Sequence, residues 1–191
     1  MVIEAPQALD ELIPATPKVR RFARALLARF RQAFPGIEYE LAWYSDSVNA
    51  QAYIRHNRKR VRVYGGLARH RLISRAGMAY AIAHETGHHL GGEPFDRTYS
   101  WLSSEIRADE WAFHEGLTKV FGPRQGAVVA VEGLAELIAV SPPNDTSRSH
   151  REQLLKEHAG VYSLRRSRAM AAVASMAPIF GARGDHHGDA V

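Results

Sequence analysis

Cysteine is absent from the 191-residue sequence, which excludes disulfides, thiol nucleophiles and thiolate metal sites. Long apolar runs are missing too, because no stretch approaches the length that a helix needs to cross a membrane. The N-terminal segment carries Glu4, Asp10 and Glu11 without a basic region followed by an apolar one, so we do not expect a signal peptide. These absences predict a soluble, cytoplasmic protein whose metal sites, if it has any, are built from His, Asp and Glu.

The basic residues gather in clusters, although the composition is ordinary for a packed domain. The chain is 46% hydrophobic and 24% charged, with a formal net charge of +5. The clusters lie at residues 20–31, 55–62 and 165–168. Such clusters could face nucleic acid, anionic lipid or an acidic substrate, but a solvated face is the more frequent case. We therefore do not favour nucleic acid as a partner, and the sequence does not indicate an oligomeric state.

The first half of the chain is predicted to form a helix and a small sheet. Thr16-Pro17 is typical of a helix start, and Pro35-Gly36 ends the run of apolar residues at helical spacing. Alternating apolar residues and turn residues then predict three strands. The predicted elements are a helix over 17–34, strands over 37–43, 50–55 and 61–64, and a hairpin turn over 56–59.

The second half is predicted to be helical. Gly91-Gly92, Gly122-Pro123 and Pro142-Pro143 separate the apolar-periodic segments. The predicted helices cover 74–90, a segment capped by Ser103 or Ser104, 124–140, 149–158 and 161–176. We expect one α+β domain over residues 1–180, followed by a disordered tail over 181–191.

A pair of histidines in the predicted helix over 74–90 carries the clearest chemical signal. His84-Glu85-Thr86-Gly87-His88 is an H-E-x-x-H motif, and four residues turn a helix by about 400°. His84 and His88 therefore project from one face and can reach the same zinc ion. Glu85 is rotated by roughly 100° from His84, so it can reach a water bound to that ion.

A catalytic zinc site needs a third protein ligand and an open position. A third histidine at the metzincin spacing would fall on Pro94, which cannot ligate. Asp96 stays open as a candidate but has no supporting pattern, whereas Glu105 begins a second predicted helix and shares a face with Asp109. We expect Glu105 to bind the metal and Asp109 to accept a hydrogen bond from the distal nitrogen of a ligating histidine, His84.

Four short motifs make the stretch from Val48 to Ala112 similar to the M48-type gluzincin zinc metallopeptidases. They are Asn49-Ala50-Gln51-Ala52, Gly66-Leu67, His84-Glu85-Thr86-Gly87-His88 and Glu105-Ile106-Arg107-Ala108-Asp109. The resemblance covers about a third of the chain. It implies a minimal soluble form of a zincin-like fold, in which a small three-stranded sheet and an active-site helix precede a mostly helical half.

The resemblance also implies a set of residue roles. Zinc would be the cofactor, with His84, His88 and Glu105 as ligands, Glu85 as the catalytic base and Asp109 as the partner of a ligand.

A weaker match follows near residue 150. Arg151 matches an arginine that the family places near the active site, whereas Ser147-Arg148 stand where a histidine–proline pair often occurs. His150 lies three positions after the place of the family's histidine. Arg151 and His150 are therefore the candidates for stabilising an oxyanion.

The sequence thus predicts a zinc metalloendopeptidase that cleaves a peptide or protein substrate with a zinc-bound water activated by Glu85. The substrate would lie extended along the strand at 50–55. Two alternatives stay open. One is a regulatory or sensor domain with a zinc site and little general proteolysis. The other is a basic nucleic-acid-binding protein with a structural metal site, against which the presence of Glu85 argues.

Overall fold

The computed structural model describes residues 11–142 and 144–158. The helix predicted over 161–176, the tail over 181–191 and the third basic cluster lie outside these residues, so they stay predictions. Among the described helices, none combines the length and the apolar character that crossing a membrane requires.

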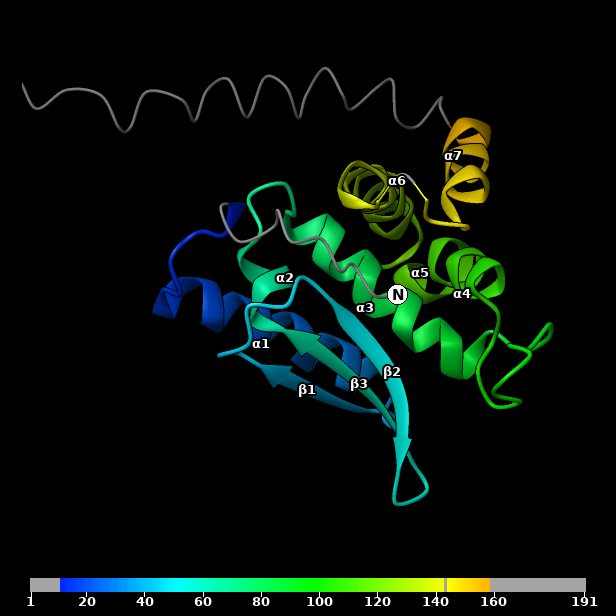
Figure 1. Ribbon diagram of the computed structural model, residues 1–191, viewed down its shortest axis with the longest axis horizontal. Coiled ribbons are helices and arrows are strands. Elements are labelled where there is room, and N and C mark those ends of the chain that lie inside the picture. The colour runs from blue at the N-terminus through cyan, green and yellow to red at the C-terminus, as the bar shows by residue number, and fades with distance from the viewer. Residues whose placement is uncertain (1–10, 143, 159–191) are drawn as a thin grey trace, which may run out of the picture.

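The chain forms an α+β fold, as predicted, with a small sheet followed by a mostly helical region (Figure 1). The strands are β1 (Glu38–Ala42), β2 (Ala50–Arg55) and β3 (Arg58–Tyr64). The helices are α1 (Pro17–Ala33), α2 (Gly65–Arg69), α3 (Arg75–Leu90), α4 (Glu105–Trp111), the π-helix η2 (Ala112–Gly116), α5 (Leu117–Phe121), α6 (Pro123–Val140) and α7 (Arg148–Glu157). The sheet order is β1-β3-β2, with β3 parallel to β1 and antiparallel to β2. β2 is therefore an edge strand.

The two faces of the sheet differ in chemistry. Tyr39, Val61 and Val63 are buried in the core, and the hydroxyl of Tyr39 lies 3.0 Å from the hydroxyl of Thr86 on α3. Side chains alternate between the faces of a strand, so the neighbouring residues point away from the core. One face thus packs on the helices and the other is polar.

The polar face carries a ladder of ion pairs between β1 and β3. Arg60 lies 2.8 Å from Glu38 and 2.7 Å from Glu40, and Arg62 lies 2.9 Å from Glu40. Arg58 adds a contact of 2.6 Å to Glu38. Much of the second basic cluster is therefore neutralised within the sheet.

Helix α3 runs through the middle of the fold, between the sheet and α6 (Figure 1). Ser74 caps it by accepting a hydrogen bond from the amide of Ala76 at 3.0 Å. The carboxylate of Glu136 on α6 accepts two more, from the amides of Ser74 at 2.8 Å and Gly77 at 3.0 Å. Every residue from Ala76 to His89 is buried, so α3 is a core helix enclosed on all sides.

Three local features differ from the sequence prediction. The hairpin turn is only His56-Asn57, both with positive φ (51° and 57°), which is the backbone of a tight two-residue turn. Helix α2 was not among the predicted helices. Its two glycines, Gly65 and Gly66, pack against backbone carbonyls of the loop after β1, where a Cβ would not fit. The helix that begins after Ser104 is interrupted by η2 before α5 completes it.

Candidate metal centre

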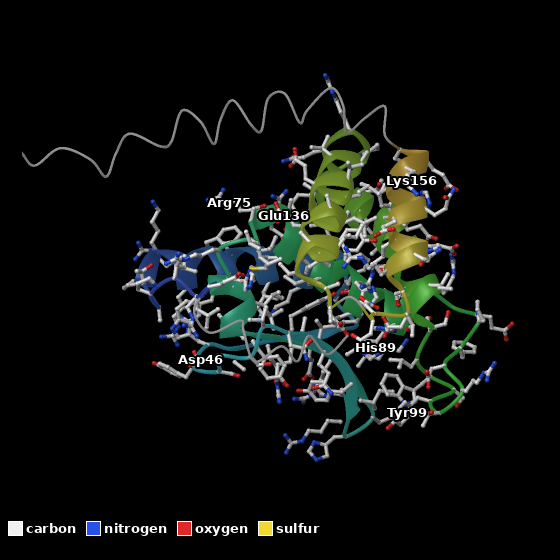
Figure 2. All side chains as sticks on the ribbon, turned by 45° about the horizontal axis from the view of Figure 1, so that its top comes forward. Asp46, Arg75, His89, Tyr99, Glu136 and Lys156 are labelled. Carbon is white, nitrogen blue, oxygen red and sulfur yellow. The ribbon has the colours of Figure 1, made fainter. Side chains whose placement is uncertain are left out.

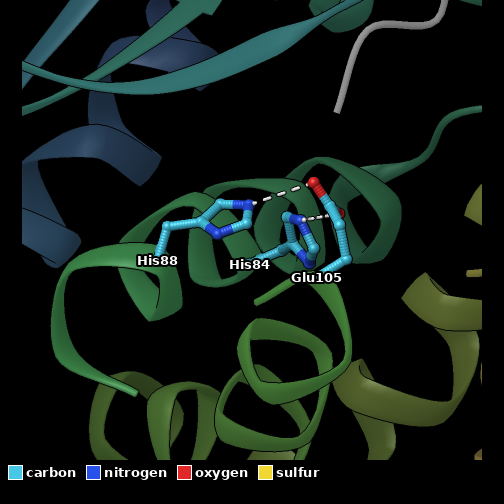
Figure 3. A group of neighbouring side chains, drawn as sticks. All are labelled: His84, His88 and Glu105. Carbon is cyan, nitrogen blue, oxygen red and sulfur yellow. Dashed lines mark ion pairs between the residues drawn. The ribbon is translucent and has the colours of Figure 1, made fainter. Parts of the chain in front are cut away.

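Three side chains from two helices converge on one point (Figure 3). Nε2 of His84 lies 3.1 Å from one oxygen of Glu105, and Nε2 of His88 lies 3.6 Å from the other. One donor atom from each residue can be chosen so that all three lie within 4.8 Å of one another. His84 and His88 come from α3 at the predicted i, i+4 spacing, and Glu105 is the first residue of α4. The structure thus brings Glu105 to the histidine pair that the spacing predicted.

The far nitrogen of each imidazole is held by an acceptor. Nδ1 of His84 lies 2.7 Å from Oδ1 of Asp109, and Nδ1 of His88 lies 2.7 Å from the backbone carbonyl of Ser103. A carbonyl can only accept, and an ionised carboxylate can only accept, so both Nδ1 atoms carry the proton. In the neutral form of each ring the lone pair is then on Nε2 and faces the centre, which is the tautomer that metal binding needs.

The electrostatics of the centre favour positive charge between the carboxylates. Burial opposes charge on His84, but Asp109 and Glu105 outweigh it and raise the pKa of His84 to about 9. Burial would raise the pKa of Asp109, but His84 and Arg151 lower it below its ordinary value, so the carboxyl stays ionised. Burial and the neighbouring His84 lower the pKa of His88.

The three residues fit a metal ion. A tetrahedral zinc with bonds of 2.0–2.1 Å sets its ligand atoms roughly 3.3 Å apart, close to the spacings of 3.1 and 3.6 Å found around Glu105. Nε2 of His84 is buried and makes no hydrogen bond of good geometry within the described residues. The side chain of Glu105 is 43% exposed, whereas that of His84 is fully buried. The centre is therefore open on the Glu105 side.

Glu85 lies beside the cluster and is also buried. Its Oε2 accepts a hydrogen bond from the backbone amide of Ala52 on β2 at 2.7 Å. Together with His88 and Glu105 it lines a cavity of about 330 Å³ between β2 and the loop that joins α3 to α4. The H-E-x-x-H motif thus places a carboxylate at the cavity next to the ligand cluster.

Arg151 and His150 lie next to each other on α7. Arg151 is fully buried and donates to Asp109 at 2.7 Å and to Asp145 at 2.8 Å. The guanidinium of Arg151 therefore positions the carboxylate of Asp109, which in turn orients the ring of His84. His150 is half-buried, and its Nε2 forms no hydrogen bond within the described part of the chain. The oxyanion role predicted for these two residues stays a prediction.

Some groups of the centre were not found from the sequence. The carbonyl of Ser103 and the amide of Ala52 are backbone groups, which no residue type reveals. Asp96, the alternative third ligand, instead accepts hydrogen bonds from the amides of Thr98 and Tyr99 at 2.7 and 3.0 Å, so it shapes the loop between α3 and α4. Tyr99 and Trp101 of that loop also line the cavity. Only the frequency of aromatic residues between the two motifs could have pointed to them.

No family model, curated protein or solved structure matches this chain. The resemblance to gluzincin metallopeptidases therefore rests on the short motifs and on their arrangement in space. What the arrangement shows is a His84, His88 and Glu105 cluster on two helices that could hold a metal ion.

Proposed function

We propose that the chain is a zinc-dependent metallopeptidase that hydrolyses peptide bonds with a water activated by Glu85. One observation carries the proposal: a separate buried carboxylate, Glu85, lines the same cavity as His88 and Glu105, two of the three residues whose donor atoms converge. A purely structural metal site does not need such a group. Two imidazoles, one carboxylate and an open side form the donor set of catalytic zinc sites.

The residues that would hold the ion are His84, His88 and Glu105. A zinc ion held there would supply a Lewis acid for the peptide carbonyl and would lower the pKa of a bound water to about 7. Glu85 would act as the general base that takes a proton from the attacking water, and then as the acid that gives it to the leaving amine. The amide of Ala52 holds one oxygen of Glu85 at 2.7 Å, which orients the carboxylate before substrate arrives.

Two carboxylates have different roles in this proposal. Asp109 keeps the proton of His84 on Nδ1 and fixes the orientation of the ring. Glu85 carries the proton of the reaction. The extended substrate lies along β2, which is an edge strand among the described residues and lines the cavity together with the loop between α3 and α4.

The test combines metal analysis with peptide hydrolysis. We expect about one zinc ion per wild-type chain, measured by mass spectrometry of the metal. Glu105→Ala removes a partly exposed ligand, so this variant folds but loses zinc. Glu85→Gln keeps zinc and lowers kcat by roughly 10²–10⁴-fold, the usual contribution of a general base.

Two outcomes would overturn the proposal. Unchanged hydrolysis by Glu85→Gln would show that Glu85 is not the base. A zinc-loaded wild type that cleaves no peptide of a diverse library would instead favour the regulatory or sensor alternative. Salt-sensitive binding of nucleic acid that survives Glu85→Gln would favour the alternative of a structural metal site.

A further inference from the structure

The cavity beside Glu85 has one wall that the proposed chemistry does not use. Its volume is about 330 Å³, which is within the usual range for a small ligand site. The wall opposite β2 comes from the loop between α3 and α4 and includes Tyr99, Trp101 and Leu102. Ile54 on β2 adds an apolar side chain from the other wall. A side chain of a bound peptide would therefore meet apolar surface on both sides.

The charged side chains among the described lining residues are those of the proposed reactive centre. Apart from Glu85, His88 and Glu105, every described lining side chain is uncharged. A charged substrate residue placed there would lose hydration without gaining an ionic partner. The wall thus selects against charged residues and favours apolar ones.

Trp101 is held in place from behind. Its ring stacks on the imidazole of His89, with 5.5 Å between centroids and 22° between planes. Nε2 of His89 lies 2.9 Å from the backbone carbonyl of Arg60, and Nζ of Lys59 donates to the carbonyl of His89 at 2.9 Å. Because a carbonyl only accepts, Nε2 of His89 donates to it. Through His89, the ring of Trp101 is thus anchored to β3 and to the end of α3, the helix that carries His84 and His88.

The loop itself is ordered by its own hydrogen bonds. The amide of Ser103 donates to the carbonyl of His88 at 2.8 Å, and the amide of Leu102 donates to the carbonyl of Tyr99 at 3.0 Å. The amide of Asp96 donates to the carbonyl of Leu102 at 2.7 Å. The wall therefore exists before substrate arrives, which reduces the entropic cost of binding.

Large apolar surface is left in contact with solvent on both walls of the cavity, at Tyr99 on the loop and at Ile54 on β2. The exposed fraction is 52% for Tyr99 and 38% for Ile54. Figure 2 shows Tyr99 and His89 on the same side of the molecule. The ring centroids of Tyr99 and Trp101 lie 5.8 Å apart, so the two rings form one continuous surface. Exposed aromatic surface next to a reactive centre is typical of ligand recognition.

We propose that Trp101 and Tyr99 form a recognition surface for a large apolar side chain, aromatic above all, in the substrate residue next to the scissile bond. This inference rests on the proposed peptidase function and names its substrate class. The ring of the substrate packs on Trp101 while its backbone follows β2, which brings the adjacent peptide bond to Glu85. Trp101 and Tyr99 determine specificity, and His89 is a positioning residue that holds Trp101.

The experiment measures kcat/KM on a matched set of internally quenched peptides. The peptides share one sequence and carry Phe on the N-terminal side of the scissile bond, Phe on its C-terminal side, Ala on both sides, or Asp on both sides. The zinc-loaded proteins are wild type, Trp101→Ala, Trp101→Phe and, as a matched control, Tyr44→Ala. Tyr44 is 85% exposed and lies outside the cavity lining. Zinc content and circular dichroism verify that each variant is folded.

We expect wild type to prefer one Phe peptide over the Ala peptide by about tenfold or more, as apolar pockets do. Trp101→Ala lowers kcat/KM for that Phe peptide about tenfold more than for the Ala peptide. Trp101→Phe restores most of the preference, and Tyr44→Ala keeps it. Equal cleavage of the Phe and Ala peptides by wild type would overturn the inference. An equal fall on both peptides in Trp101→Ala would also overturn it, because a merely structural role has that effect.

A binding measurement separates this inference from the proposed function. The same peptides, labelled with a fluorophore, are titrated with zinc-loaded Glu85→Gln, and anisotropy reports the affinity. If wild type cleaves no peptide, the proposed function fails. The recognition surface still stands if the Phe peptide binds about tenfold more tightly than the Ala peptide and the added Trp101→Ala change removes the difference. Equal binding of both peptides would overturn it.

Discussion

Replacing Arg151 by Met removes a buried cation that lies among three carboxylates, those of Asp109, Asp145 and, at 3.7 Å, Glu105. Arg151 is fully buried and lies 2.7 Å from Asp109, which is fully buried too, and 2.8 Å from Asp145. The change leaves Asp109 paired with His84 alone. Breaking one side of a buried ion pair costs about 3–5 kcal/mol. That is a large part of the roughly 5–15 kcal/mol by which a domain is usually stable.

The assay is urea unfolding followed by circular dichroism, with a chelator present so that metal binding does not contribute. The matched control is Arg148→Met on the same helix. Arg148 is 34% exposed and pairs with Glu152 at 3.1 Å, also at the surface. Solvent screens such a pair, so we expect its loss to change the free energy of unfolding by less than about 1 kcal/mol. Arg151→Lys keeps the charge but loses the guanidinium that donates to Asp109 and Asp145 at once. The stability of this variant should fall between those of wild type and Arg151→Met.

The reasoning is refuted if Arg151→Met unfolds like wild type while peptide hydrolysis falls by a factor of about a hundred or more, the effect of losing an oxyanion donor. That result would give Arg151 the oxyanion role that the sequence suggested. A large loss of stability, accompanied by weaker zinc binding, would show that Arg151 acts by holding Asp109 and through it His84.

Three further predictions concern packing, pH and metal. Gly133→Ala would place a Cβ 2.7 Å from the Cβ of Tyr80 on α3, so we expect the free energy of unfolding in urea to fall by about 1–3 kcal/mol. The control Gly36→Ala adds a Cβ with nothing within 4 Å and should unfold like wild type. Equal effects of the two substitutions would contradict this packing. Burial lowers the pKa of His70 although Glu11 opposes the shift, so its stabilising effect is present above the ordinary value of 6.5 and lost as pH falls below it. The free energy of unfolding of wild type relative to His70→Gln should therefore decline from about pH 7 to pH 5, and a rise would refute the sign. Zinc at a hundred times its dissociation constant should add about 2.7 kcal/mol to the free energy of unfolding of wild type, measured by thermal unfolding. Glu105→Ala should gain no stability from zinc in the same measurement.

The histidine pair, His84 and His88, was predictable because its spacing depends on one helix alone. His84 and His88 are four residues apart on one helix, so the backbone alone sets their spacing. Glu105 lies on another helix, and only its shared face with Asp109 and the family resemblance pointed to it. The contacts of Asp109 with His84 confirm that geometry. The carbonyl of Ser103 could not be foreseen, since every residue has such a group and only tertiary packing selects one.

The fold was predictable to a similar depth. The strands and α3 follow from alternation, caps and glycine stops, which are local signals. Helix α2 could not be predicted, because glycine has a low helix propensity. Gly65 and Gly66 are needed there because a Cβ would collide with the loop after β1, and that contact is set by tertiary packing. The π-helix after Trp111 is likewise set by packing, since the indole ring occupies the space where Gly116 lacks a side chain.

The burial of α3 on every side has a consequence for exchange kinetics. A helix at the surface can fray and release a ligand while the rest of the domain stays folded. The amides around His84 and His88 have no such route, so their hydrogen exchange should proceed only through global unfolding and should be among the slowest in the chain. Glu105, at the partly exposed start of α4, is the member of the cluster that local opening can free. A metal ion would therefore enter and leave from the side of Glu105, at a rate set by the opening of one helix end.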